Sequence, residues 1–175
     1  MNWLDLALYL QIYSFLGWCT EVLYYAVIRR KFCNRGFLTT PFLLSYGAAF
    51  DLMILTLPAL AGRYVVQFLF TTAIVSVTES VADHMNRQLG PKVNWGGERP
   101  RLLGGSLRGL ISSAAVAAVF YMVYLVVHPL LLGVTTLIPP LAEKIIVWVL
   151  FALMAADFIG VLYTLRTGGA PAYER

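Results

Sequence analysis

Four acidic residues lie inside long apolar stretches of this sequence: Glu21, Asp51, Glu79 and Asp157. On insertion scales, a charged side chain at the centre of a bilayer costs at least about 2.5–3.5 kcal/mol, so each acid needs a partner or a function. A carboxylate in such a place can bind a cation, carry a proton or hold a polar head group. The four acids are therefore the first candidates for a functional site.

Near these acids the sequence shows no recognisable metal, nucleotide or triad site. His84 follows Asp83, but it is rotated off the helix face that Asp83 shares with Glu79. Zinc ligands at a spacing such as His-x3-His are missing, as are a Ser-x-Gly elbow and a Gly-x-x-x-x-Gly-Lys loop. We predict no metal, no cofactor and no ATP hydrolysis by this chain, and leave open whether it is an enzyme.

The composition predicts an integral membrane protein. The chain has 175 residues, of which 59% are hydrophobic and 13% charged, and its mean hydropathy is +0.74. About 20 apolar residues, rising 1.5 Å each, cross a hydrocarbon layer of about 30 Å. Because lipid offers the backbone no hydrogen-bond partner, such spans must be helices. We predict an all-α polytopic helix bundle in the cell membrane, with the lipid bilayer as its surroundings.

Five spans are predicted from the apolar runs, within a single transmembrane domain of residues 1–175. Residues 29–40 and 83–102 form loops on one side, and residues 128–144 form an outer loop. This outer loop contains three prolines, so we predict a non-helical interfacial or partly re-entrant segment there. The five spans cover residues 3–28, 41–61, 64–82, 103–127 and 145–165.

The basic residues orient the predicted bundle. Of the 13 Lys and Arg residues, 11 fall on one side, and only Arg63 and Lys144 fall on the other. Basic loops stay in the cytoplasm, so the N-terminus is predicted outside and the C-terminus inside. The net charge of +4 then reflects topology, and no nucleic-acid partner is expected.

This topology places Glu21 and Glu79 at a similar shallow depth beside the two basic cytoplasmic loops. A cluster of these acids with Arg35, and with Arg101 or Arg108, is expected, because desolvated acids recruit basic partners. Three interpretations stay open for it. The acids form structural ion pairs at helix ends, or line a polar cavity that binds an ion, a proton or a head group, or extend along the helix to reach water.

Asp51 and Asp157 lie nearer the middle of the membrane in this scheme. If both face inward, they extend such a cavity into a pathway. If they face each other and share one proton, they only contribute to packing. The sequence does not decide between these two arrangements.

Two stretches resemble a bacterial family of small membrane proteins that is named "putative ABC-transporter type IV", or CmpB-like permeases. The stretches are "YSFLGWCTEVLYY", Tyr13 to Tyr25, and "KFCNRGFLTTPFLLSYG", Lys31 to Gly47. Thr40 departs from the family pattern, as do Leu44 and Ser45, because the pattern has a glycine and a second proline there. Glu79, Trp95 and the pair His128-Pro129 also fit the family. The matching residues of the two stretches are Gly17, Trp18, Glu21, Asn34, Arg35, Gly36, Phe37, Leu38, Pro41, Tyr46 and Gly47.

The resemblance implies a transport permease component with a polar site near the cytoplasmic leaflet. In a turn made by Asn34, Arg35 and Gly36, the arginine would point back toward Glu21. Five helices are few for a complete transporter, so we expect a homo-oligomer or a partner membrane subunit, and a separate ATPase. The alternative is a membrane-embedded lipid- or isoprenoid-binding protein, or an enzyme, that uses Glu21, Glu79 and Arg35. The candidate ligand-binding residues are Glu21, Asn34, Arg35, Glu79, His84, Arg101 and Arg108.

Overall fold

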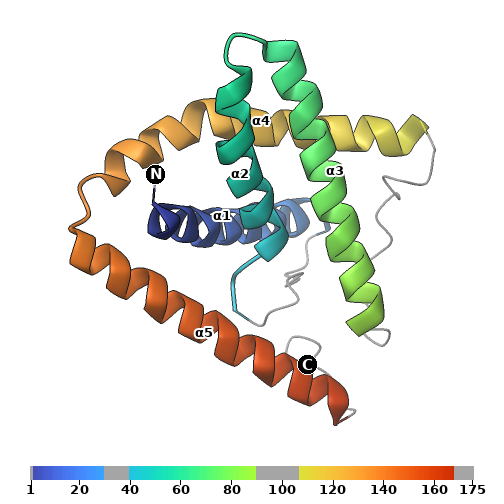
Figure 1. Cartoon of the computed structure of the whole chain (residues 1–175). Helices are drawn as coiled ribbons and strands as arrows, with labels where there is room; N and C mark the ends of the chain where they lie inside the picture. The colour runs from blue at the N-terminus through green and yellow to red at the C-terminus, as the bar shows by residue number, and fades with distance from the viewer. Residues whose placement is uncertain (1, 30–39, 90–106, 168–175) are drawn as a thin grey trace.

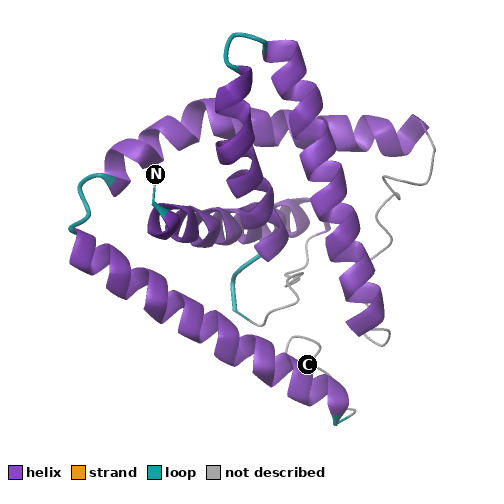
Figure 2. Ribbon diagram, viewed as in Figure 1, coloured by secondary structure: helices purple, strands orange, loops and turns teal. Residues whose placement is uncertain are grey.

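The computed structural model describes residues 2–29, 40–89 and 107–167. These residues form helices joined by loops and turns, as Figure 2 shows, and within the described ranges there is no strand. The helices are α1 (Trp3–Arg29), α2 (Leu44–Thr56), the 3-10 helix η1 (Leu57–Leu60), α3 (Tyr64–Leu89), α4 (Leu107–Thr135) and α5 (Pro140–Arg166).

Four of these helices are long and apolar enough to cross a membrane, by length and composition. Their apolar stretches are Trp3–Leu23, Tyr64–Ala82, Ala114–Thr135 and Pro140–Thr164. α2 and η1 together form a shorter apolar segment, Leu44–Leu60, which falls below the roughly 20 residues of a full span. The all-α membrane helix bundle is thus confirmed, while the orientation of the termini stays a prediction.

α4 extends further than the sequence suggested. The non-helical segment predicted from residue 128 is wrong for residues 128–135, which form the end of α4 with Pro129 inside the helix. A proline removes one backbone hydrogen bond, but lipid offers the other backbone groups no competing partner, so the helix continues. Figure 1 shows α4 bending in this last part. Residues 136–139 make the turn to α5, whose first residue is Pro140, a favoured proline position.

The helices meet at a crossing rather than in a set of parallel rods. In Figure 1 the hairpin of α2 and α3 passes in front of α1 and α4, and α1 has its most extensive contact with α2. The turn of this hairpin contains Gly62 at φ 81°, a conformation that suits glycine. The core lies at the crossing and is built from large side chains: Tyr13, Phe50, Met53, Leu57, Val75 and Phe120.

α5 stands apart from this crossing. It follows the turn after α4 and packs chiefly along α1. Most of its long apolar side chains are exposed in the isolated chain, among them Leu141, Trp148 and Ile159. Exposed apolar residues of this kind are what a lipid-facing helix requires.

The hydroxyl groups of α3 are largely satisfied within the helix itself. Thr72, Ser76 and Ser80 each donate a hydrogen bond to the carbonyl four residues earlier. Such back-bonding removes the cost of carrying a free hydroxyl into lipid. These polar residues are therefore compatible with an apolar span.

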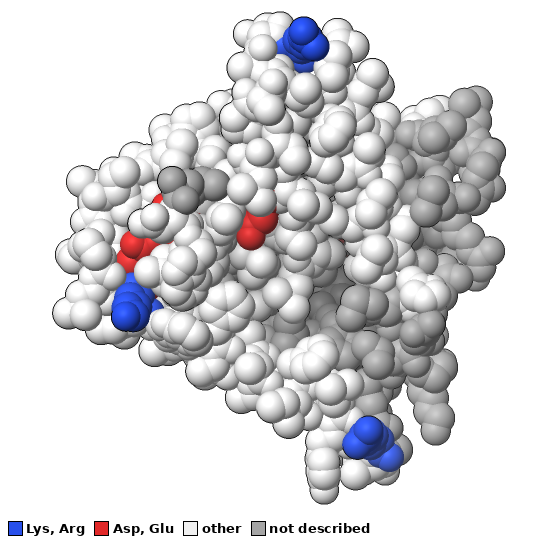
Figure 3. All heavy atoms as spheres, in the orientation of Figure 1, with Lys and Arg blue, Asp and Glu red and all other residues white. Residues whose placement is uncertain are grey.

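The surface is mostly uncharged on the face that Figure 3 shows. The visible basic side chains stand at the extremities of this face, over the α2–α3 turn and the two ends of α5. Arg63, Lys144 and Arg166, at those places in the chain, are all exposed. Basic groups at the ends of elements and apolar groups between them are the pattern of a membrane protein.

Candidate functional site

Two glycines let α1 and α2 approach closely. A Cβ on Gly47 would collide with the carbonyl oxygen of Leu10 and the hydroxyl of Ser14 on α1. A Cβ on Gly17 would lie 2.5 Å from the ring of Tyr46 on α2. Small residues at crossings allow this kind of backbone contact in membranes. Tyr46 and Gly47, which are neighbours in the sequence, therefore each pack directly against α1: Gly47 beside Leu10 and Ser14, and Tyr46 beside Gly17.

Glu21 lies at the same crossing, one turn beyond Gly17. The hydroxyl of Tyr46 donates a hydrogen bond of 2.5 Å to its Oε1. The Tyr46 ring also packs against Phe120 of α4, with a centroid distance of 5.0 Å. A charge-assisted bond of this kind is short and strong. Gly17, Glu21, Tyr46 and Gly47 thus form one unit, which we call the α1–α2 motif.

A second polar group lies deeper in the core, around His128 of α4. The hydroxyl of Tyr13 and Nδ1 of His128 are hydrogen-bonded at 3.0 Å, and both side chains are buried. Tyr124 stacks on the imidazole at a centroid distance of 5.6 Å, and Tyr9 meets it edge-on at 5.3 Å. The Tyr9 hydroxyl in turn is hydrogen-bonded to Thr135 at 2.9 Å. An imidazole enclosed by three tyrosines is an unusual structure inside an apolar span.

Several polar atoms near this region are buried without a hydrogen-bond partner. They are Oε1 of Gln11, Oγ of Ser14, Oδ1 of Asp51 and Oγ1 of Thr71. Asp51 directly follows Phe50, whose ring stacks on that of Tyr13 at a centroid distance of 4.0 Å. Buried polar groups are nearly always paired, so unpaired ones indicate water, an ion or a functional role.

Asp157 serves a different place in the fold. Its Oδ2 accepts two hydrogen bonds from Thr40, one from the backbone N–H at 2.8 Å and one from the hydroxyl at 2.7 Å. Asp157 therefore joins α5 to the segment that leads into α2. A second polar contact joins α5 to α1, because Nε2 of Gln11 donates to the Val147 carbonyl at 3.0 Å.

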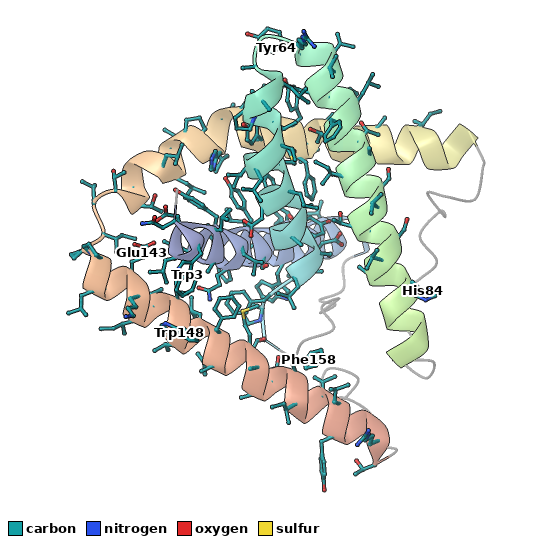
Figure 4. The ribbon with its side chains drawn as sticks, in the orientation of Figure 1. Trp3, Tyr64, His84, Glu143, Trp148 and Phe158 are labelled. Carbon is teal, nitrogen blue, oxygen red and sulfur yellow. The ribbon has the colours of Figure 1, made fainter. Side chains whose placement is uncertain are left out.

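An apolar groove of about 470 Å³ runs between the start of α1 and the middle of α5. Trp3 and Trp148 face each other there, as Figure 4 shows, with ring centroids 6.2 Å apart in an edge-to-face arrangement. Phe151, Ala152 and Ala155 complete the α5 side together with Val147. The groove provides almost no polar surface to a ligand.

The predicted ligand-binding residues are only partly visible. Glu79 is half-buried on α3, and His84 is exposed further along the same helix, where Figure 4 labels it. Arg108 lies in the first turn of α4, but its side chain is not among those described. Asn34, Arg35 and Arg101 lie outside the described residues. The cluster around Glu21 and Glu79 therefore stays a prediction.

Sequence reasoning missed the polar residues that the core does contain. Gln11 and Ser14 were available signals, because two polar residues interrupt an apolar run three positions apart, on one helix face. His128 was also available, as a histidine between "YLVV" and a proline. The pairing of His128 on α4 with Tyr13 on α1 depends on the crossing of the helices.

Within the described residues, no group of three or more His, Cys, Asp or Glu side chains could hold a metal ion.

A family model described as "Putative ABC-transporter type IV" matches residues 8–162 of the chain. The chain belongs to this family. The match takes in all of α2, α3 and α4 and most of α1 and α5, and it confirms the resemblance to this family. No curated protein and no solved structure matches. The family and the four apolar helices together identify a transport-related membrane protein.

Proposed function

We propose that this type IV family member is a permease component in the cell membrane, with a polar site at the cytoplasmic leaflet. The observation that supports the proposal is the α1–α2 motif. An acid inside an apolar helix is held by a tyrosine on the next helix, at a contact that two glycines make possible. Acids kept inside membrane spans are commonly substrate or ion sites.

The isolated chain favours assembly over a transporter made of one copy. Only 22%, 17% and 17% of the residues in the apolar stretches of α3, α4 and α5 are buried, so most of these residues keep surface that lipid or another subunit can contact. We propose a second membrane subunit, or a second copy of this chain, and a separate ATPase on the cytoplasmic side. ATP hydrolysis would then drive the transport of a solute that contacts Glu21.

Affinity purification of the full chain from its own membranes, in mild detergent, tests the assembly. We expect a stoichiometric partner and ATP hydrolysis by the purified complex after transfer to lipid nanodiscs. Glu21→Gln should reduce this hydrolysis at least tenfold while the complex stays assembled. A chain that purifies alone, or a complex without ATP hydrolysis, would contradict the permease proposal.

The proposed orientation has its own test by thiol labelling in intact cells, with Cys19 and Cys33 replaced by serine. A membrane-impermeant maleimide added outside should label Arg63→Cys at the tip of the α2–α3 hairpin. It should not label Arg166→Cys at the end of α5 until the membrane is opened. The opposite result would place the N-terminus in the cytoplasm.

The lipid-binding alternative receives weaker support from the geometry. The apolar groove could hold a hydrocarbon chain, but it begins at Trp3, and Glu21 lies 18 residues further along α1. At 1.5 Å per residue, the two are about 27 Å apart along the helix. The groove and the acid therefore belong to opposite ends of the span, and one lipid head group next to the groove would not reach Glu21.

A further inference from the structure

The buried histidine and its hydroxyl partner form a pair in which the direction of the hydrogen bond can reverse. When His128 is neutral, its Nδ1 can accept the hydrogen of the Tyr13 hydroxyl across 3.0 Å. When the imidazole is protonated, both ring nitrogens carry hydrogen, and Nδ1 must donate to the Tyr13 oxygen. The hydroxyl hydrogen of Tyr13 is then free to turn toward another acceptor.

Asp51 offers such an acceptor on the neighbouring helix. Its Oδ1 is buried and has no hydrogen-bond partner, and it directly follows Phe50, whose ring stacks on that of Tyr13. An unpaired carboxylate in hydrocarbon is costly, so this acid gains most from a nearby positive charge or a proton. Tyr13 thus contacts His128 through its hydroxyl and Phe50, the residue before Asp51, through its ring, at a centroid distance of 4.0 Å.

The surroundings of His128 can accommodate a cation. Tyr124 lies parallel to the imidazole and presents its ring face, Tyr9 meets the imidazole edge-on, and the Tyr13 ring lies tilted to it. Aromatic faces attract a positive charge, and more strongly where water is excluded. The titratable groups that the described residues place around the imidazole are Tyr9 and Tyr13 from α1 and Tyr124 from α4, with Asp51 of α2 acting through Tyr13.

We propose that Asp51, Tyr13 and His128 form a proton-binding unit inside the membrane domain. Uptake of one proton converts the imidazole to imidazolium, reverses the Tyr13–His128 hydrogen bond and directs the Tyr13 hydroxyl hydrogen to the Asp51 carboxylate. Release of the proton restores the starting arrangement, so no other reactant is needed. The unit deepens the proposed function, because it would place a proton-binding site inside the permease, but its proton binding can be tested without transport.

The chain has two histidines, which makes the test direct. The purified full chain in lipid nanodiscs, labelled with ¹⁵N at histidine, is titrated by NMR between pH 4 and pH 9. His84, which is exposed, provides an internal reference, and His84→Gln assigns the two signals. We expect Asp51→Asn to move the midpoint of His128 toward lower pH by about one unit, the coupling typical of interacting sites, and to leave His84 unchanged.

Tyr13→Phe tests the connecting role of the hydroxyl and keeps the aromatic ring. In a Tyr13→Phe background, Asp51→Asn should shift His128 by less than half as much as it does in the natural chain. The proposal is overturned if His128 does not titrate, if Asp51→Asn leaves its midpoint in place, or if Tyr13→Phe leaves the shift at full size. The dispersion of amide signals shows whether each variant is folded, and Asp51→Ser replaces any Asp51→Asn sample that is not. Proton binding without any ATPase partner would support this site even if the permease proposal failed.

Discussion

The crossing of α1, α2 and α4 and the outlying helix α5 are built by different means. At the crossing, the α1 and α2 backbones touch through Gly47, and Tyr13, Phe50 and Phe120 form a continuous stack. α5 packs chiefly on α1, beside an apolar groove, and its ties to the rest include two polar contacts. The α1–α2 contact is closely fitted, whereas a groove leaves part of the contact between α5 and α1 open.

The comparison shows that polar residues have different roles in the two regions. At the crossing they add to the stability of close packing, and on α5 they hold the helix in its position. In hydrocarbon, apolar surface gives helices no hydrophobic reason to associate, so close packing and hydrogen bonds must hold them. The crossing combines both, through its glycines and through the Glu21–Tyr46 bond. α5 relies more on its hydrogen bonds, because the groove leaves part of its contact with α1 open.

The largest effect is expected from Gly47→Ala. The added methyl group would collide with the backbone carbonyl of Leu10, which cannot move without shifting α1. Overpacking of this kind costs about 3 kcal/mol, so the thermal unfolding midpoint should fall sharply. Gly160→Ala on α5 is the matched control, since nothing lies within 4 Å of its Cβ position. Equal unfolding midpoints of the two variants in nanodiscs would refute the close fit of the crossing.

Tyr46→Phe should have the next largest effect. It keeps the ring against Phe120 but removes the donor to Glu21, so a half-buried carboxylate loses a 2.5 Å bond. Loss of a hydrogen bond to a charged group costs about 1.5–3 kcal/mol. Tyr163→Phe on α5, where the ring is exposed, is the control and should leave the midpoint in place. A similar result for both tyrosines would show that the motif hydroxyl adds nothing to stability.

The central stack offers a matched pair of phenylalanines. Phe50 lies between Tyr13 and Phe120, with centroid distances of 4.0 Å and 4.8 Å, whereas Phe151 lines the groove on α5. We expect Phe50→Leu to lower the free energy of unfolding by about 1.5 kcal/mol, because aromatic contacts and volume are both lost. Phe151→Leu should cost less than about 0.5 kcal/mol, because lipid can fill the space. Denaturant titration in detergent gives both values, and a larger loss for Phe151 would reverse the comparison.

The sequence predicted the membrane class and the helical fold because lipid imposes both on an apolar chain. Glu21, Tyr46 and Gly47 were among the residues that carried the family resemblance, and the structure brings them together at one contact. The path of α4 was harder to predict, since Pro129 stops a helix in water more readily than in lipid. The Tyr13–His128 pair was beyond sequence reasoning, because 115 residues separate its members and only the crossing brings them together.

The smallest effect on global stability is expected from Asp157→Leu, which should instead release α5. The substitution removes the acceptor of both Thr40 hydrogen bonds and leaves the crossing intact. Asp157→Asn is the matched control, because its amide oxygen can still accept from Thr40.

Spin labels at the exposed positions Leu55 on α2 and Ile159 on α5, with Cys19 and Cys33 replaced by serine, report the distance between the two regions. We expect a broad distance distribution for Asp157→Leu, a narrow one for Asp157→Asn and the natural chain, and unfolding midpoints within 1 °C of each other. A narrow distribution in all three would mean that packing on α1, and not the Thr40 hydrogen bonds, holds α5 in place. The two regions would then differ only in how closely their side chains pack.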